Sequence, residues 1–143
     1  MIDLHSHILS DMDDGALTLA ESLAMAQLAA TSGTRVLAAT PHSPGSTACR
    51  HYAPELVRAR IDELNAALAA EGIPLDVVPG TEICYAPDIV ERLKRGELLT
   101  YGRGRSLLLE LDRNHLPPGF ENALFNLQIA GYRVVLAHPE RIV

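Results

Sequence analysis

The chain has 143 residues, of which 48% are hydrophobic and 21% are charged, so its composition is that of a globular domain rather than a disordered chain. Its net charge is −6 and only one of its twelve basic residues, Lys94, is a lysine. Without a basic stripe or an aromatic platform, the sequence argues against nucleic-acid binding. No apolar stretch approaches membrane-spanning length, and Asp3 and His5 interrupt the N-terminus before the apolar run of a signal peptide could form. We therefore expect a cytoplasmic protein without membrane insertion.

The first half of the chain alternates between apolar runs and helical patterns. Residues 1–4 predict a short strand, and residues 18–21 match a capping box that opens a helix, which Gly33 closes. Residues 35–40 predict a second strand. A long helix is expected between Pro54 and Gly72, because apolar residues recur there at helical spacing: Val57, Ile61, Leu64 and Leu68.

The second half continues this alternation. Strands are predicted at residues 76–78, 106–112 and 133–137, and helices at residues 88–95 and 120–130. Gly96 and Gly131 follow these two helices, where glycine commonly ends a helix. Five strands that alternate with helices, with no repeat or linker between them, predict a single α/β domain over residues 1–143 with a parallel sheet.

Polar residues recur where the predicted strands end, which is where α/β folds place their sites. In an extended strand, side chains two residues apart point to the same side, so His5 and His7 can face one metal ion. Further candidates follow or end the other strands, namely His42, Glu82, Glu110 and His138. Three histidine-bearing and two glutamate-bearing strand ends together predict a metal site.

Each candidate has an alternative explanation when it is taken alone. His5 and His7 are also compatible with two partly exposed polar residues that leave a strand. A carboxylate among leucines costs several kcal/mol unless it is paired, so Glu110 needs a cation, and Arg105 or Arg113 could supply it in place of a metal.

Five segments together resemble the polymerase and histidinol phosphatase (PHP) superfamily. They are Met-Ile-Asp-Leu-His-Ser-His at residues 1–7, Asp-Asp-Gly-Ala at 13–16, Ala-Thr-Pro-His at 39–42, Gly-Thr-Glu at 80–82, and Ala-His-Pro-Glu-Arg at 137–141. Within the superfamily, the chain is similar to the bacterial metal-dependent tyrosine-protein phosphatases of capsule and exopolysaccharide operons. The resemblance extends over essentially the whole chain.

This resemblance implies a distorted (β/α)7 barrel with up to three divalent ions, usually manganese, at the carboxyl ends of its strands; iron, zinc or magnesium are alternatives. The positions that match metal ligands are His5, His7, His42, Glu82, Glu110 and His138. Asp14 is a further candidate ligand, although Asp-Gly also favours a tight turn without any metal. Arg141 matches an arginine that engages the phosphate, and with His7 and His42 it forms the expected catalytic set.

The expected chemistry is hydrolysis of phosphotyrosine. Divalent ions lower the pKa of a bridging water, and the resulting hydroxide attacks phosphorus in line and expels the phenolate. A cysteine mechanism is not expected, because thiol phosphatases need an arginine six residues after the cysteine. Here Cys49 is followed at that distance by Glu55, and Cys84 by Val90. Both thiols are therefore interpreted as small packing residues.

The resemblance also implies partners and leaves alternatives open. The expected partner is a phosphotyrosine protein, specifically a bacterial tyrosine kinase of polysaccharide export. A histidinol-phosphatase-like phosphoesterase and an inactive remnant are the other two hypotheses. The family fold continues beyond position 143, so we expect an incomplete barrel of about five strands, an unpaired sheet edge and a possible homo-oligomer.

Two loop features are less specific. The segment at residues 43–52 could line a substrate entrance, or it could be an ordinary solvated loop. His51 and His115 are expected to be surface histidines.

Overall fold

The computed structural model describes residues 1–111 and 116–141, and these form parallel strands that alternate with helices. The α/β class predicted from the sequence is confirmed. The elements in chain order are β1 (Ile2–Ser6), α1 (Leu19–Thr31), β2 (Val36–Ala39), α2 (Pro54–Ala70), β3 (Asp76–Pro79), β4 (Glu82–Cys84), α3 (Ile89–Lys94), β5 (Ser106–Glu110), α4 (Phe120–Ile129), β6 (Arg133–Leu136) and a 3-10 turn, η1 (Pro139–Arg141).

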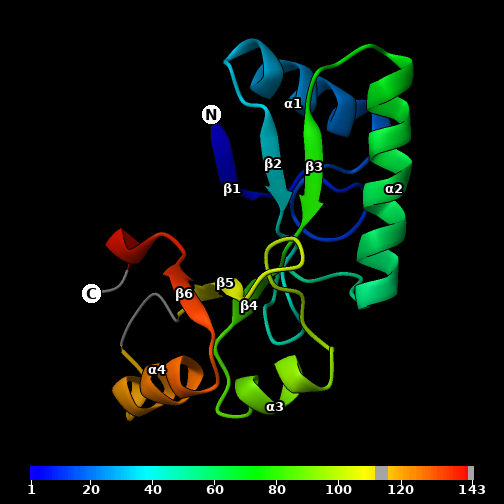
Figure 1. The fold of residues 1–143 in the computed structure, drawn as a ribbon. Helices are drawn as coiled ribbons and strands as arrows, with labels where there is room; N and C mark the ends of the chain where they lie inside the picture. Colours follow the sequence, from blue (N-terminus) through cyan, green and yellow to red (C-terminus); the bar gives the residue numbers. More distant parts are fainter. Residues whose placement is uncertain (112–115, 142–143) are drawn as a thin grey trace.

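The strands form two parallel sheets, ordered β1-β2-β3 and β4-β5-β6 (Figure 1). The sheets meet where the backbones of His42 and Glu82 form an isolated parallel bridge. At this junction the Ser43 N–H donates to the Glu82 carbonyl over 2.9 Å, and the Glu82 N–H donates to the Pro41 carbonyl over 3.1 Å. The strand ends that carry the candidate ligands therefore converge on the line between the sheets.

The prediction of five strands was wrong, because the structure has a sixth, β4, between the predicted third and fourth. The chain leaves β3 at Pro79 and starts a new pairing with β5 at Glu82. At Gly80, a Cβ would lie 3.1 Å from Thr40 Cγ2 and 3.2 Å from a Tyr101 ring carbon. The absence of a side chain therefore lets the backbone pass close to its neighbours as it changes sheets. The predicted end of the fourth strand, Asp112, lies outside the described residues.

The helices follow the sequence patterns. Thr18 Oγ1 accepts the Glu21 N–H over 3.2 Å at the start of α1, and Glu21 in turn accepts the Leu17 N–H over 2.7 Å. This confirms the predicted cap. The predicted stripe of α2 is also confirmed, since Val57, Ile61, Leu64 and Leu68 are all buried.

Each sheet has its own apolar core. Side chains of α1 and α2 pack with the first sheet, and those of α3 and α4 pack with the second. Tyr52 packs against both cores, and its hydroxyl lies 2.8 Å from Thr81 Oγ1. The two cores hold the two sheets, and hence the junction between them, in place.

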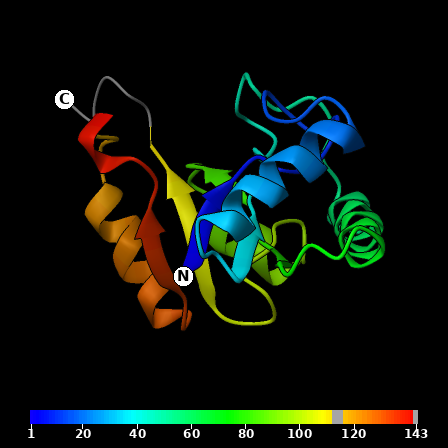
Figure 2. The same ribbon diagram turned by 90° about the horizontal axis from the view of Figure 1, so that it is seen from above.

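The described residues do not close into a barrel. Within them, β1 pairs only with β2 and β6 only with β5, so each has an open edge (Figure 2). The predicted open sheet edge is confirmed, whereas the expected (β/α)7 barrel is not. No helix in this part of the chain is long and apolar enough to cross a membrane.

Candidate metal centre

The predicted ligands lie around one cavity of about 310 Å³, at the carboxyl ends of β1, β2, β5 and β6 and at the first residue of β4. β1 ends beside His5 and His7, β2 leads into His42, β4 begins at Glu82, β5 ends at Glu110 and β6 leads into His138. The structure thus brings together every predicted side chain of the site, and they line this cavity: His5, His7, Asp14, His42, Glu82, Glu110, His138 and Arg141.

Glu82 lies at the centre of this group and is only 1% exposed. Its Oε2 atom lies 3.2 Å from His5 Nε2, 3.2 Å from His7 Nε2 and 3.3 Å from His42 Nδ1. Its Oε1 atom lies 2.8 Å from His138 Nε2. One buried carboxylate therefore contacts four imidazoles that arrive from three different strand ends.

Glu110 completes the far side of the cavity. Its Oε2 atom lies 3.4 Å from His42 Nδ1, and its Oε1 atom lies 3.8 Å from His138 Nε2. The alternative partner Arg105 instead donates to the Ala130 carbonyl over 3.0 Å and lies over the ring of Tyr132. The other alternative, Arg113, lies outside the described residues.

The positions of the ligand nitrogen and oxygen atoms suit coordination of a cation better than hydrogen bonding among themselves. Within the described part of the chain, Glu82 Oε2 and His42 Nδ1 are buried without a hydrogen-bond partner, which is costly for polar atoms. Two ligands of one ion, each about 2.1 Å from it at roughly right-angled to tetrahedral geometry, lie about 3.0–3.4 Å apart. The separations around Glu82 Oε2 fall in this range, as does the 3.3 Å between His5 Nε2 and His7 Nε2. Imidazole and carboxylate donors together suit manganese, iron or zinc.

The pKa values reflect the same crowding. Burial favours neutral His7, but its hydrogen bond to Asp13 and the nearby Glu82 carboxylate outweigh burial and raise the pKa of His7 to about 10. Burial favours protonated Glu82, but the imidazoles of His5 and His7 outweigh it and hold the pKa of Glu82 well below its usual range. Both shifts favour the charged forms of His7 and Glu82.

The sequence prediction missed one residue of the site, Asp13, and named only its neighbour Asp14. Asp13 is fully buried, and its Oδ2 atom lies 2.7 Å from His7 Nδ1. Asp14 is 63% exposed, and its Oδ1 atom lies 3.6 Å from His42 Nε2 and 4.0 Å from His7 Nδ1. A tight turn was the alternative explanation for Asp14. The side chain that makes the turn hydrogen bond is instead that of Asp13, which accepts the Gly15 N–H over 3.0 Å. An Asp-Asp-Gly sequence does not reveal which carboxylate is buried.

Arg141 is exposed on η1 and lines the rim of the same cavity. His138 precedes this turn and has a φ of 28°, a value that non-glycine residues rarely adopt. Such strain is commonly found at functional sites, where the surrounding contacts maintain it. The ring of the same residue reaches Glu82, with Nε2 2.8 Å from Oε1.

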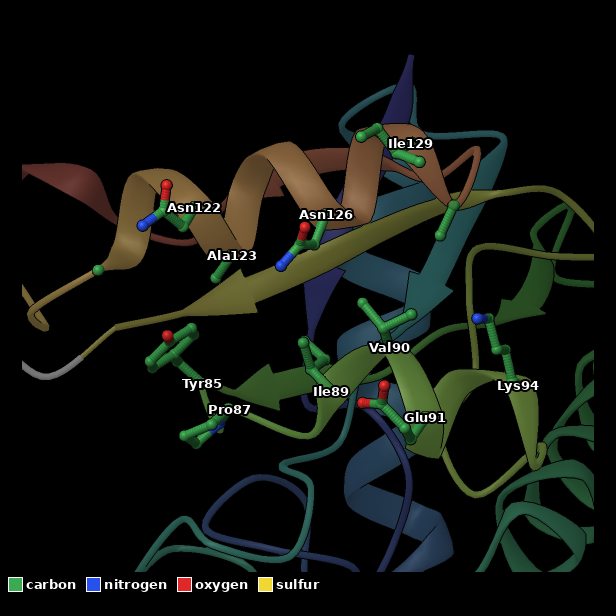
Figure 3. Close-up of a pocket in the computed structure, with 12 residues that line it drawn as sticks. Tyr85, Pro87, Ile89, Val90, Glu91, Lys94, Asn122, Ala123, Asn126 and Ile129 are labelled. Carbon is green, nitrogen blue, oxygen red and sulfur yellow. The ribbon is translucent and has the colours of Figure 1, made fainter.

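Two other cavities lack comparable chemistry. One of about 550 Å³ lies between α3 and α4 and includes Asn122, Asn126 and Lys94 (Figure 3). One of about 620 Å³ includes Arg58 and Arg103. Neither shares a lining residue with the histidine cavity or contains a histidine or cysteine.

The Cys49 thiol is not activated as a nucleophile. Both Cys49 and Cys84 are half-buried, and burial together with the Asp13 charge raises the pKa of the Cys49 thiol. A raised pKa disfavours the reactive thiolate. In the 43–52 segment, His51 is exposed as expected. The backbone N–H groups of Arg50 and His51 both donate to the Met12 carbonyl over 3.0 Å, so this loop is tied to the turn that carries Asp13. His115 lies outside the described residues.

The family described as "Capsular polysaccharide synthesis, CpsB/CapC" matches residues 1–143. The tyrosine-protein phosphatase YwqE of Bacillus subtilis (strain 168) is 40% identical over 141 residues, covering 99% of this chain and 55% of that protein. The tyrosine-protein phosphatase CpsB of Streptococcus pneumoniae is 32% identical over 145 residues, covering 99% of this chain and 57% of that protein.

The fold agrees with a solved structure of this group. The match has a TM-score of 0.94 at 40% identity, and it covers 99% of this chain and 57% of the other. That work describes YwqE from Bacillus subtilis and CpsB from Streptococcus pneumoniae as "unique metal-dependent tyrosine phosphatases". The chain spans about half the length of the curated relatives that it matches.

Proposed function

The chain belongs to the CpsB/CapC family of capsular polysaccharide synthesis, and on that premise we propose that it carries the metal site of a metal-dependent protein-tyrosine phosphatase. One observation supports this most strongly: the buried Glu82 Oε2 atom is surrounded by three imidazole nitrogens at 3.2–3.3 Å and has no hydrogen-bond partner among the residues that the structure describes. The names of the relatives at 40% and 32% identity support the reaction type. We propose residues 1–143 as part of one PHP domain whose complete form is the (β/α)7 barrel.

We propose manganese as the metal, held by His5, His7, His42, Glu82, Glu110 and His138, with Asp14 as a further ligand at the exposed rim. When bound, divalent ions would supply the positive charge that makes a water molecule acidic near neutral pH and that attracts phosphate oxygens. The carboxylates would hold those ions and offset their charge. The buried position of Glu82 would keep bulk water from competing for them.

His7, His42 and Arg141 are the proposed catalytic residues. His7 and His42 would contact the ions directly, and both rings belong to the group around Glu82 Oε2. The guanidinium of Arg141, at the rim of the cavity, would donate N–H groups to the phosphate oxygens as negative charge develops on them. The displaced phenolate would then leave toward the open side of the cavity.

We propose that the substrate is the phosphorylated tyrosine of a bacterial tyrosine kinase of polysaccharide export. The family's link to capsular polysaccharide synthesis supports this choice. Because tyrosine phosphorylation uses ATP, the two proteins would meet in the cytoplasm. The open edge of β1 carries the exposed side chains of Ile2 and Leu4, and it is the surface that we propose for a homo-oligomer.

The test is phosphate release from a phosphotyrosine peptide by metal-stripped protein that has been reloaded with Mn²⁺. We expect release that depends on Mn²⁺, that is lost in His7→Ala, and that exceeds release from histidinol phosphate. Activity equal to that of His7→Ala would contradict the proposed reaction. Faster turnover of histidinol phosphate would contradict the proposed substrate class.

A further inference from the structure

We infer that Asp13 is a positioning residue that fixes the ring of His7 and ties the backbone of His42 to the same carboxylate. This role rests on the proposed function, because it concerns how two metal ligands are held. Asp13 does not itself need to touch the ion. It would act through the residues that do.

The hydrogen bonds that Asp13 makes within the described residues support this role. The Oδ2 atom lies 2.7 Å from His7 Nδ1 and accepts the His42 N–H over 2.9 Å. The Oδ1 atom accepts the Gly15 N–H over 3.0 Å. The side chain is fully buried, so no solvent competes for these bonds. These three bonds fix the position of the carboxylate.

The contact with His7 determines which nitrogen faces the cavity. Because a carboxylate only accepts hydrogen bonds, Nδ1 of His7 must carry the proton of this pair. When the ring is neutral, Nε2 then has a free lone pair, and Nε2 is the atom that lies 3.2 Å from Glu82 Oε2. A carboxylate behind a ligating imidazole both orients the ring and makes it a stronger ligand.

The contact with His42 links two strand ends. His7 follows β1, whereas His42 follows β2, and their rings lie 4.6 Å apart between centroids. The single oxygen Oδ2 accepts from the ring of one and from the backbone of the other. Movement of Asp13 would therefore displace both ligands together.

The turn around Asp13 is built for close approach to His7. A Cβ at Gly15 would lie 2.1 Å from the His7 carbonyl oxygen, so only glycine fits there. The Ala16 N–H donates to that same carbonyl over 3.1 Å. The turn is therefore bound to His7 twice, through the backbone N–H of Ala16 and through the side chain of Asp13.

Asp13→Asn is the informative substitution because it preserves shape and changes hydrogen bonding. The asparagine oxygen can accept a backbone N–H, but its amide group can also donate to His7 Nδ1. His7 would then carry its proton on Nε2, and that nitrogen could not bind a metal. We expect the dissociation constant for Mn²⁺ to rise about 10- to 100-fold, the range typical when such a supporting carboxylate is lost.

The experiment is calorimetric titration of Mn²⁺ into metal-stripped wild-type protein, Asp13→Asn and Asp11→Asn. Asp11 lies in the same turn, is exposed and has a φ of 58°, which asparagine adopts readily, so it is the matched control. Weakened binding in Asp13→Asn alone is expected. Equal affinity in Asp13→Asn and wild type would overturn the positioning role but not the proposed function. Failure of the wild type to bind Mn²⁺ would overturn both.

A second measurement does not depend on the folding of the variant. Nitrogen-15 NMR of the imidazoles in wild-type protein loaded with diamagnetic Zn²⁺ identifies the protonated nitrogen of each ring. We expect His7 to show a proton on Nδ1 and zinc on Nε2. Zinc on Nδ1, or a proton on Nε2, would overturn the role of Asp13 even if Asp13→Asn did not fold.

Discussion

His42 and Glu82 contact each other through both backbone and side chain. Their backbones form the bridge between the two sheets, and His42 Nδ1 lies 3.3 Å from Glu82 Oε2. The junction of the fold is therefore also the centre of the site. Since each sheet has its own core, the packing on both sides determines the relative position of the ligands. Changes at this junction should affect stability and metal binding together.

Glu82→Gln tests the central carboxylate. Glutamine carries no negative charge, so the surrounding imidazoles would lose the buried carboxylate that they all contact. We expect the free energy of unfolding of the metal-free protein to fall by roughly 3 kcal/mol, and Mn²⁺ binding to be lost. Urea denaturation and calorimetry measure the two effects.

Glu63→Gln is the control for that substitution. Glu63 is 48% exposed on α2 and pairs with Arg60 over 2.9 Å. Exposed pairs contribute about 0–1 kcal/mol, so little change in stability is expected. Equal effects of the two substitutions would argue against a special role for Glu82.

The stability of the metal-free protein should depend on pH in a defined direction. The pKa of His7 is raised from 6.5 to about 10 by Asp13 and Glu82 against the effect of burial, so its contribution is complete below pH 6.5 and is lost as pH rises toward 10. The pKa of Glu82 is lowered from 4.5, so its contribution is lost as pH falls below that value. The free energy of unfolding in EDTA should therefore fall from pH 6.5 to pH 9. His7→Gln should flatten this slope, and a rise over the range would contradict the prediction.

Gly15→Ala tests the close approach of the turn to His7. The new Cβ would overlap the His7 carbonyl and Cβ, which lie 2.1 and 2.4 Å from its ideal position. We expect loss of Mn²⁺ binding and a clear fall in the melting temperature. Gly72→Ala introduces strain at a φ of 68° but meets no atom within 4 Å. It should cost about 1 kcal/mol and leave Mn²⁺ binding intact, so metal loss in both variants would contradict the role of the turn.

The sequence predicted most of the fold, because its helices and strands follow local rules. The cap at Thr18 and the stripe on α2 are examples. It did not predict β4, whose three residues follow a Gly-Thr pair that looks like the end of β3. Whether such a segment extends one sheet or starts another depends on long-range packing around Gly80, which no local pattern contains.

Part of the candidate site could also be predicted from local sequence patterns. Residues at strand ends are visible in the sequence, and the structure brings His5, His42 and Glu110 to one cavity. Asp13 could not be distinguished from Asp14, because the burial of one carboxylate depends on the position of His7 and on the backbone of His42, 29 residues away.

Arg141→Lys separates substrate binding from metal binding. Lysine keeps the charge but cannot reproduce the planar two-pronged contact with phosphate. Since Arg141 is exposed and lines the cavity with its side chain, we expect unchanged Mn²⁺ affinity and a roughly tenfold loss in kcat/KM for a phosphotyrosine peptide. Reduced metal affinity would show instead that Arg141 supports the ligands.

The most direct test of the account is the location of manganese by anomalous diffraction from crystals of the Mn²⁺-loaded protein. We predict at least one strong anomalous peak in the cavity, about 2.0–2.3 Å from Glu82 Oε2 and the facing imidazole nitrogens. A fully loaded protein with peaks only outside this cavity, or with Glu82 Oε2 not bound to an ion, would contradict it.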